Sequence, residues 1–341
     1  MLGHVPIVVI SMLILGCGSK TASNNIVPAS SGQQEDLGLA ELRRTLESTV
    51  LENYEQLTYG NIEAFADGVA TEQDLQVAGV TPSDLLVGRS PAKLRKDRRL
   101  FKQRQPRILS KNLEVHLSKD GSVGWVSDEA SYRVDFEGRE ASIPIRSTAV
   151  YVRDVDRWVM AAEHLSYGVP IADVLRLAAG GELHAMPPLK TSFGGSRKRT
   201  APLLGLVGSF INIGGAEVLA ATDTLVLLPG QEQEFRDGEA LALAQIFGDR
   251  STAALREFRI QFAKSKRVAW ILASLAIRTE RNGDTVEVPL RASFVLEREG
   301  QGDWGIVQAH VSAPLLESQI SERVFGVGSD SEPRLDVPTN P

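Results

Sequence analysis

Alternating apolar and polar residues fill two long stretches of the chain and predict an antiparallel meander in each. In the first stretch, the turn at Lys119-Asp120-Gly121 supplies the positive φ angles that a tight hairpin needs. In the second, Arg281-Asn282-Gly283-Asp284 is the strongest hairpin signal of the sequence. The predicted strands are 108–118, 122–134, 140–152 and 157–166 in the first stretch, and 268–279, 285–297 and 304–312 in the second.

Helical periodicity precedes each meander. Apolar residues recur at spacings of three or four from Leu39 to Leu57, which is the stripe of an amphipathic helix, and Asp36 can cap its start. Ser90-Pro91 is typical of a second helix start, because proline is tolerated in the first turn. The other predicted elements are short strands at 84–87 and 224–228, a helix from 90 to about 104, a helix at 237–248 and a glycine-interrupted, irregular helix at 203–213.

The two stretches are diverged copies of one module. Trp270 follows Trp125 by 145 positions and Trp304 follows Trp158 by 146 positions, so one residue is inserted between the two registers. We therefore expect module 1 over 36–170, a helix and linker over 171–199, a more diverged module 2 over 200–316 and a disordered tail over 317–341. The recurring residues are Trp125, Arg146, Trp158, His164 and Ser166 in the first copy and Trp270, Arg291, Trp304, His310 and Ser312 in the second.

The amino-terminal segment predicts export. An apolar run from Val5 to Leu15 is too short to cross a bilayer, and it ends in Gly16-Cys17, after which the composition turns polar. This ending resembles the lipobox of bacterial lipoproteins, and the resemblance makes Cys17 the lipid attachment site. We expect a signal peptide over 1–17, a flexible tether over 18–35, and a lipid-anchored protein of the cell envelope, on the outer membrane if the cell has one. The alternative is an ordinary secretory signal with an incidental cysteine.

Composition excludes several classes of function. The chain has 341 residues, 43% hydrophobic and 23% charged, the balance of a globular protein long enough for two domains. Its formal charge of −6 offers no general attraction for nucleic acid, so no nucleic-acid partner is expected. Cys17 is the only cysteine, which excludes an intramolecular disulfide and a cysteine-based metal site. The histidines are isolated in sequence, so we expect no metal and no cofactor.

The helices followed by a curved meander resemble the SnoaL-like branch of the nuclear transport factor 2 fold. The most specific segments are Gly124-Trp125-Val126, the strand ending in Ile143-Pro144-Ile145-Arg146, and 158–166. The resemblance implies an α+β protein with two tandem cystatin-like cones, each a curved antiparallel sheet of about four long strands packed on two to three helices. A pocket opens at the wide end of such a cone. Members of this superfamily include polyketide cyclases, ketosteroid isomerases, limonene epoxide hydrolases, dehydratases and many non-catalytic binding or dimerising modules, so a fold of this kind predicts a cavity more firmly than a reaction.

Strand alternation suggests which residues line the cones. His164 and His310 each share a strand face with apolar residues, which indicates that this face points inward. The resemblance implies that the inward face of this strand lines the cone. Each histidine is a candidate general base or hydrogen-bond donor to a bound carbonyl. Alternatively, each histidine closes the end of the core by donating to a backbone carbonyl. The predicted ligand-binding residues are Trp158, Met160, His164 and Ser166 in module 1 and Trp304, Gln308, His310 and Ser312 in module 2.

The acids differ between the copies. Asp128 and Glu129 are candidate catalytic partners of His164, but Ala273 and Ser274 occupy the corresponding positions of module 2. Glu163 corresponds to Ala309, and we expect it to form a structural salt bridge with Arg146 on the neighbouring strand. At most module 1 is therefore expected to be catalytic.

Three hypotheses for the function follow. The first is a non-catalytic, lipid-anchored protein that binds a small apolar ligand or a protein partner. The second is an enzyme of the cyclase or isomerase type that uses the cavity of module 1. The third is a structural scaffold in which the two modules pair within the chain as a pseudo-dimer.

Overall fold

The computed structural model describes residues 31–70, 75–89, 91–96, 107–136, 139–213, 218–219, 224–230, 234–236, 242–299 and 302–325. The predicted signal peptide with Cys17 and most of the predicted tether lie outside the described residues, as do residues 326–341 of the predicted tail. Within the described ranges, no helix is both long and apolar enough to cross a membrane.

Module 1 is built on a six-stranded sheet with the order β2-β1-β6-β5-β4-β3. Its four long strands lie within two residues of the predicted ones at every end, and they pair as an antiparallel meander. The short strand β1 pairs in parallel with β6 and antiparallel with β2. The strands are β1 (Leu75–Ala78), β2 (Leu85–Arg89), β3 (Arg107–Leu117), β4 (Val123–Phe136), β5 (Arg139–Asp154) and β6 (Arg157–Ser166).

Module 2 repeats this topology with the order β8-β7-β12-β11-β10-β9. Its short strand β7 again pairs in parallel with the last long strand, β12. The predicted hairpin between β10 and β11 is confirmed: Asn282 and Gly283 have φ of 54° and 89°, the left-handed values that a two-residue turn requires. The strands are β7 (Leu225–Leu227), β8 (Glu234–Arg236), β9 (Thr252–Phe262), β10 (Val268–Arg281), β11 (Asp284–Arg298) and β12 (Trp304–Ser312).

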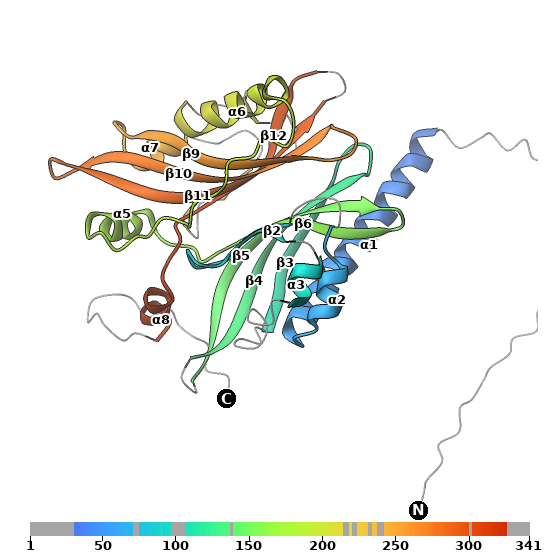
Figure 1. The fold of residues 1–341 in the computed structure, drawn as a ribbon, viewed down its shortest axis with the longest axis horizontal. Helices are drawn as coiled ribbons and strands as arrows, with labels where there is room; N and C mark the ends of the chain where they lie inside the picture. Colours follow the sequence, from blue (N-terminus) through green and yellow to red (C-terminus); the bar gives the residue numbers. More distant parts are fainter. Residues whose placement is uncertain are drawn as a thin grey trace, which may run out of the picture. The chain divides into compact units, whose positions relative to one another are not determined.

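The described helices of module 1 are α1 (Ser31–Thr58), α2 (Ile62–Asp67) and α3 (Pro91–Lys96) (Figure 1). The predicted apolar stripe of α1 is confirmed, because Leu46, Val50 and Tyr54 are buried in the core of the module. The helix begins at Ser31, five residues before its predicted start, and so takes up the end of the predicted tether.

Among the described residues, helices α5 (Ile171–Ala179), α6 (Arg197–Asn212) and α7 (Leu243–Ile246) accompany module 2. Figure 1 shows α6 along the face of the β9–β12 sheet that is turned away from module 1. The expectation of an irregular helix here is wrong, since α6 runs for 16 residues through its glycines. Each glycine destabilises a helix by about 1 kcal/mol relative to alanine. Burial of Leu203, Val207 and Phe210 outweighs this cost.

The sequence predicted a disordered tail after module 2, but the first part of this tail is a helix. Residues Glu317–Phe325 form α8, in which Ile320 is buried. Gln319 donates to the carbonyl of Glu182, and Arg323 donates to Asp173 of α5 over 2.9 Å. These contacts to residues about 140 positions earlier stabilise a helix whose own sequence is mostly polar.

The outer faces of the two sheets pack against each other. The apolar part of this contact joins Trp125 and Val159 of module 1 to Trp270 and Val307 of module 2. Each inner face instead packs against the helices of its own module, and we call the space between that face and the helices the cone. The central parts of the long strands therefore have one face in a cone and one face in the contact between modules, whereas residues such as Leu109 and Glu129 are exposed.

Candidate functional site

A β-bulge in β6 changes the predicted orientation of the site residues. Tyr151 pairs with Met160 and Val150 pairs with Ala162, so Ala161 is an extra residue on this strand. Trp158 and Met160, before the bulge, lie in the core of the cone. After the bulge the alternation is reversed, so that His164 and Ser166 lie on the outer face. The prediction that all four share one inward face is wrong for this reason.

The same bulge recurs in β12. Leu296 pairs with Ile306 and Val295 pairs with Gln308, which leaves Val307 as the extra residue. Trp304, before the bulge, packs against the core of the cone. Gln308, after it, donates to the backbone carbonyl of Val126 in module 1 over 3.1 Å. His310 and Ser312 follow on the same outer face. Five of the eight predicted ligand-binding residues therefore lie between the modules, namely Gln308, the two histidines and the two serines.

The two histidines form the centre of a buried cluster. Their rings stack with centroids 3.9 Å apart and planes inclined by 19°, and neither side chain is exposed to solvent. His164 bonds through Nδ1 to Ser293 (3.0 Å) and through Nε2 to Ser312 (2.8 Å), both in module 2. We call these six side chains the histidine cluster: His164, Ser166, Thr148, His310, Ser312 and Ser293.

His310 makes the reciprocal contacts to module 1. Its Nδ1 lies 3.0 Å from Oγ1 of Thr148 and its Nε2 lies 2.7 Å from Oγ of Ser166. The cluster therefore has approximate two-fold symmetry, in which each module places its histidine between two hydroxyl groups of the other. The expectation that each histidine bonds to a backbone carbonyl at the end of its own core is replaced by this exchange across the contact.

Burial, together with the hydrogen bonds, indicates that both rings are neutral. Ser312 accepts from Nε of Arg291 over 2.8 Å, so its own proton is available to Nε2 of His164, which leaves the His164 proton on Nδ1. Burial lowers the pKa of His164 well below its usual value, and the charges of Arg291 and Arg146 lower it further. Burial lowers the pKa of His310 likewise, with His164 and the same arginines adding to the effect.

The two repeated arginines also act across the contact. Arg291 donates to the carbonyls of Val80 (2.9 Å) and Thr81 (3.3 Å) in module 1. Arg146 donates to the carbonyl of Gly230 (2.9 Å) in module 2. Burial lowers the pKa of Arg291 to about 9, so its guanidinium is still charged at neutral pH. The expected salt bridge between Glu163 and Arg146 is wrong, because the β6 bulge places these side chains on opposite faces of the sheet.

The cone of module 1 holds a second cluster of polar side chains, of which the sequence singled out only Asp128 and Glu163. We call it the module 1 polar cluster: Asn53, Tyr54, Asp128, Ser147, Tyr151 and Glu163, all buried. Asn53 donates to the hydroxyl of Tyr151 over 3.1 Å. Burial raises the pKa of Glu163 to about 7 and, with the charge of Glu163, also raises the pKa of Tyr151. Tyr54 of α1 and Tyr151 of β5 lie at inward positions, but in the sequence such tyrosines cannot be distinguished from ordinary aromatic residues of a core.

The predicted catalytic acids differ in their environments. Asp128 is buried in the cone, where its Oδ1 accepts from the backbone N–H groups of Lys111 (3.3 Å) and Asn112 (3.1 Å). Burial raises the pKa of Asp128, and these hydrogen bonds oppose the shift. Glu129 is exposed on the other face of the same strand. Asp128 lies in the cone, whereas His164 lies on the outer face of the sheet. Glu129 is exposed, whereas His164 is buried. The predicted catalytic trio is therefore not brought together.

A family model described as a SnoaL-like domain matches residues 46–172 and 222–316. The chain belongs to the SnoaL-like domain family. Similar solved structures include an NTF2-like protein with a cystatin-like fold from Novosphingobium aromaticivorans (12% identity, 41% of this chain and 91% of that chain, TM-score 0.34). Another is a putative scytalone dehydratase from the same species (12% identity, 38% of this chain and 85% of that chain, TM-score 0.32). A third is a putative calcium/calmodulin dependent protein kinase II association domain from Xanthomonas campestris (20% identity, 36% of this chain and 86% of that chain, TM-score 0.32). No curated protein sequence matches the chain.

The two SnoaL-like modules differ in their cone interiors. In module 2 the positions of Asp128 and Glu163 are taken by Ala273 and Ala309, both buried in an apolar core. Phe294 and Phe210 meet edge to face in this core, with ring centroids 5.7 Å apart. The two buried acids of the module 1 cone therefore have apolar counterparts in module 2. Among the described residues, no group of three or more histidine, aspartate or glutamate side chains is arranged to hold a metal ion.

Proposed function

We propose that the protein is an exported, lipid-anchored binding protein without catalytic activity, in which the two SnoaL-like modules act as one unit. The observation that carries this proposal is the histidine cluster. His164 and His310 are the proton-transfer candidates common to both modules, and all four ring nitrogens are hydrogen-bonded to serine or threonine. A general base must lie within hydrogen-bond reach of the proton that it removes, directly or through one water.

The small space beside the histidines also supports a role without catalysis. A crevice of about 20 Å³ lies beside His164, bordered by Thr148 and Ser293, and has room for about one water molecule. A substrate would have to separate the two sheets to reach either ring. The cluster then serves to pair the modules, which combines the binding hypothesis with the pseudo-dimer hypothesis.

The module 1 polar cluster makes the cone of module 1 the better candidate of the two for a ligand, because it places buried polar side chains among apolar ones. A small-molecule site is typically an apolar cavity with a few placed polar groups. Asn53 and Tyr151 offer such groups among the apolar side chains of Val50, Met160 and Trp158. The ligand that fits this chemistry is a small, mostly apolar molecule with one hydrogen-bonding oxygen. A protein partner on the surface is the alternative outcome of the test.

Ligand binding is tested by a thermal-shift and native mass spectrometry screen of apolar ketones and alcohols against the full chain. A bound compound should raise the melting temperature of the wild type and lose most of this effect in Tyr151→Phe. Tyr59→Phe is the matched control, because the Tyr59 side chain is 78% exposed. A screen in which no compound acts, while a partner protein co-purifies at fixed stoichiometry, would contradict the small-ligand proposal.

Lipid anchoring is tested separately. The full chain produced in a bacterium with radiolabelled palmitate should carry label and sediment with membranes, and Cys17→Ala should lose both. Label retained in Cys17→Ala would overturn the assignment of that cysteine.

A specific observation favours one other function, an acid–base enzyme in module 1. Glu163 has a pKa raised to about 7 and lies beside Tyr151 and Tyr54, an arrangement suited to proton transfer near neutral pH. If a screen of isomerase and dehydratase substrates finds turnover, Glu163→Gln should abolish it and His164→Gln should retain it. The reverse result would return catalysis to the histidine.

A further inference from the structure

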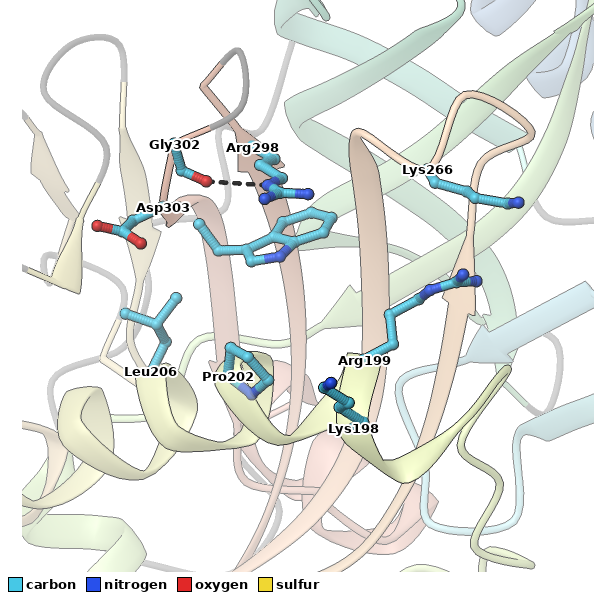
Figure 2. A pocket seen from close by; sticks show the side chains of 9 residues that line it. Lys198, Arg199, Pro202, Leu206, Lys266, Arg298, Gly302 and Asp303 are labelled. Carbon is cyan, nitrogen blue, oxygen red and sulfur yellow. Dashed lines mark hydrogen bonds between the residues drawn. The ribbon is translucent and has the colours of Figure 1, made fainter.

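A second site lies on module 2, away from both the histidine cluster and the cone of module 1. A pocket of about 500 Å³ is bordered by the first turns of α6, the β9–β10 turn and the β11–β12 turn (Figure 2). Figure 2 shows Lys198, Arg199 and Pro202 extending from α6, opposite Arg298 and Gly302. The lining residues are Lys198, Arg199, Pro202, Leu206, Lys266, Arg298, Gly302, Asp303 and Trp304.

The rim of this pocket is strongly basic. Four of its side chains are cationic and one is acidic, on a chain whose formal charge is −6. Within the described part of the chain, Lys198, Arg199 and Lys266 form no ion pair, although Arg199 lies over the ring of Phe262 at 5.9 Å. The pocket also adjoins the amino terminus of α6, whose first turn carries no acidic residue. The local positive charge is therefore available to an external anion.

The floor of the pocket is apolar. Trp304 is only partly buried, and Pro202 and Leu206 of α6 complete this surface. The indole ring of Trp304 is supported from behind by Phe262, with ring centroids 6.1 Å apart. A partly exposed aromatic ring beneath a cationic rim is suited to a molecule with an apolar or aromatic body and an anionic head.

In module 1, helix α1 fills the space that corresponds to this pocket. Trp158, the counterpart of Trp304, is buried and donates from Nε1 to Oγ1 of Thr45 on α1 over 3.1 Å. Gly121 in the β3–β4 turn has φ of 63°, and a Cβ there would lie 2.9 Å from Leu42 of the same helix. Helix α1 thus covers this region of module 1.

Module 2 leaves that space open and lines it with charge. Lys266 occupies the position 145 residues after Gly121 and has nearly the same φ, 59°. A lysine in this left-handed conformation is disfavoured relative to glycine. A glycine is required in module 1 because α1 lies close above the turn, whereas in module 2 the turn bears a cation at the rim of the pocket.

We propose that the Trp304 pocket binds a small anionic ligand with an apolar or aromatic body, in which a phosphate, sulfate or carboxylate meets Lys198, Arg199 and Lys266 and the body lies on Trp304. The cations supply charge-assisted hydrogen bonds, and the pocket volume matches a molecule of drug-like or nucleotide-like size. The inference is independent of the ligand proposed for the cone of module 1, since it uses none of the same residues.

Two fluorescent probes distinguish the contribution of charge to binding from that of the apolar contact. 8-Anilinonaphthalene-1-sulfonate and N-phenyl-1-naphthylamine have the same aromatic body, but only the first carries an anion. The full chain should bind about one equivalent of the sulfonate at this pocket and bind the neutral probe more weakly. Lys198→Ala/Lys266→Gly should weaken binding of the sulfonate on the order of tenfold and leave the neutral probe within about twofold.

The matched control is Lys111→Ala/Lys190→Ala, which removes two exposed lysines elsewhere and changes the net charge equally. It should leave sulfonate binding unchanged. Lys266→Gly alone removes a cation and relieves its left-handed backbone, so loss of binding together with an unchanged or raised melting temperature excludes misfolding as the cause. Equal binding by wild type and the Lys198→Ala/Lys266→Gly variant, or equal loss in the control, would overturn the proposal.

Competition identifies the source of the anion. Phenyl phosphate represents a soluble phosphate ester, and vesicles of phosphatidylglycerol, compared with phosphatidylcholine, represent a lipid headgroup. Displacement of the sulfonate by phenyl phosphate alone supports a soluble ligand, and displacement by anionic vesicles alone supports a lipid. Displacement by neither would overturn the anionic part of the proposal.

Discussion

His164 and His310 stack face to face at 3.9 Å although 146 positions separate them in the chain, and each ring is hydrogen-bonded on both nitrogens by hydroxyl groups of the opposite module. Neutral imidazoles can approach this closely, whereas two charged ones would repel each other in a medium of low dielectric. The contact between the modules therefore depends on the protonation state of these two rings.

Truncation of one histidine should destabilise the whole protein. His310→Ala leaves the hydroxyl groups of Thr148 and Ser166 without their ring partners and opens a cavity in the contact. We expect the free energy of unfolding in urea to fall by about 2–4 kcal/mol. The control is His184→Ala, since His184 is exposed and should cost less than about 0.5 kcal/mol. Similar losses in the two variants would contradict the structural role of His310.

Acidification should weaken the contact between the modules. The folded protein holds the pKa of both buried histidines well below the value of about 6.5 that they have in an unfolded chain. The unfolded chain then binds more protons, so the stability that these groups contribute is present above about pH 6.5 and is lost as the pH falls below it. The two groups together can give a slope of up to about 2.7 kcal/mol per pH unit.

Urea unfolding of the wild type and of His164→Gln/His310→Gln between pH 7.5 and 5 measures this slope. The double variant should show a flatter dependence of the unfolding free energy on pH, and His184→Gln should behave as the wild type. An unchanged slope in the double variant would assign the pH dependence to other groups.

Glu163 should act in the opposite sense. Its pKa in the folded protein is raised to about 7, so its contribution is most favourable below the unfolded value near 4.5 and is lost as the pH rises through 7. Glu163→Gln should therefore stabilise the protein above pH 8 by up to about 3 kcal/mol and have little effect at pH 4.5. Thermal unfolding at both pH values tests this, with the exposed Glu129→Gln as control. Stabilisation that is equal at the two pH values would show that charge burial is not its cause.

Replacement of Arg291 by lysine should destabilise the protein. The guanidinium bonds to Ser312 and to the carbonyls of Val80, Thr81 and Leu165, a fork that a single ammonium group cannot reproduce. Loss of these bonds in Arg291→Lys should lower the free energy of unfolding by about 3–5 kcal/mol. Hydrogen exchange should also become faster in the loop of residues 79–84, because the carbonyls of Val80 and Thr81 lose their donor.

The control is Arg278→Lys. Arg278 pairs with Glu287 at the surface, where its side chain is 61% exposed, so the exchange should cost less than about 1 kcal/mol. If Arg291→Lys were equally mild, the fork at Arg291 would not be needed to hold the module 1 loop.

Local patterns predicted the strands well. The ends of β3 to β6 lie within two residues of prediction because alternation and turn residues act over a few positions. The repeat was also visible, since Trp125 and Trp270 recur in one register. Strands β1, β8 and β9 were missed. In β1, four buried residues with no alternation carry little signal.

Side-chain orientation beyond a bulge was not predictable from alternation. One extra residue, Ala161 in β6 and Val307 in β12, reverses the faces of everything that follows. Both are small or medium apolar residues in apolar strands, so nothing in the sequence distinguishes them from ordinary strand positions. The same reversal moved Glu163 into the cone and thereby created the module 1 polar cluster.

The amino-acid sequence by itself determined the α+β class, the duplication, the SnoaL-like character and the difference in acids between the copies, because each depends on residue type and spacing along the chain. Only the tertiary structure decided that His164 meets His310, that Arg291 bonds to a loop 210 positions earlier, and that the space above Trp304 is open while the space above Trp158 is filled. These relationships depend on which sheet faces meet and where helices α1 and α6 lie, and packing free energy summed over the whole fold sets both.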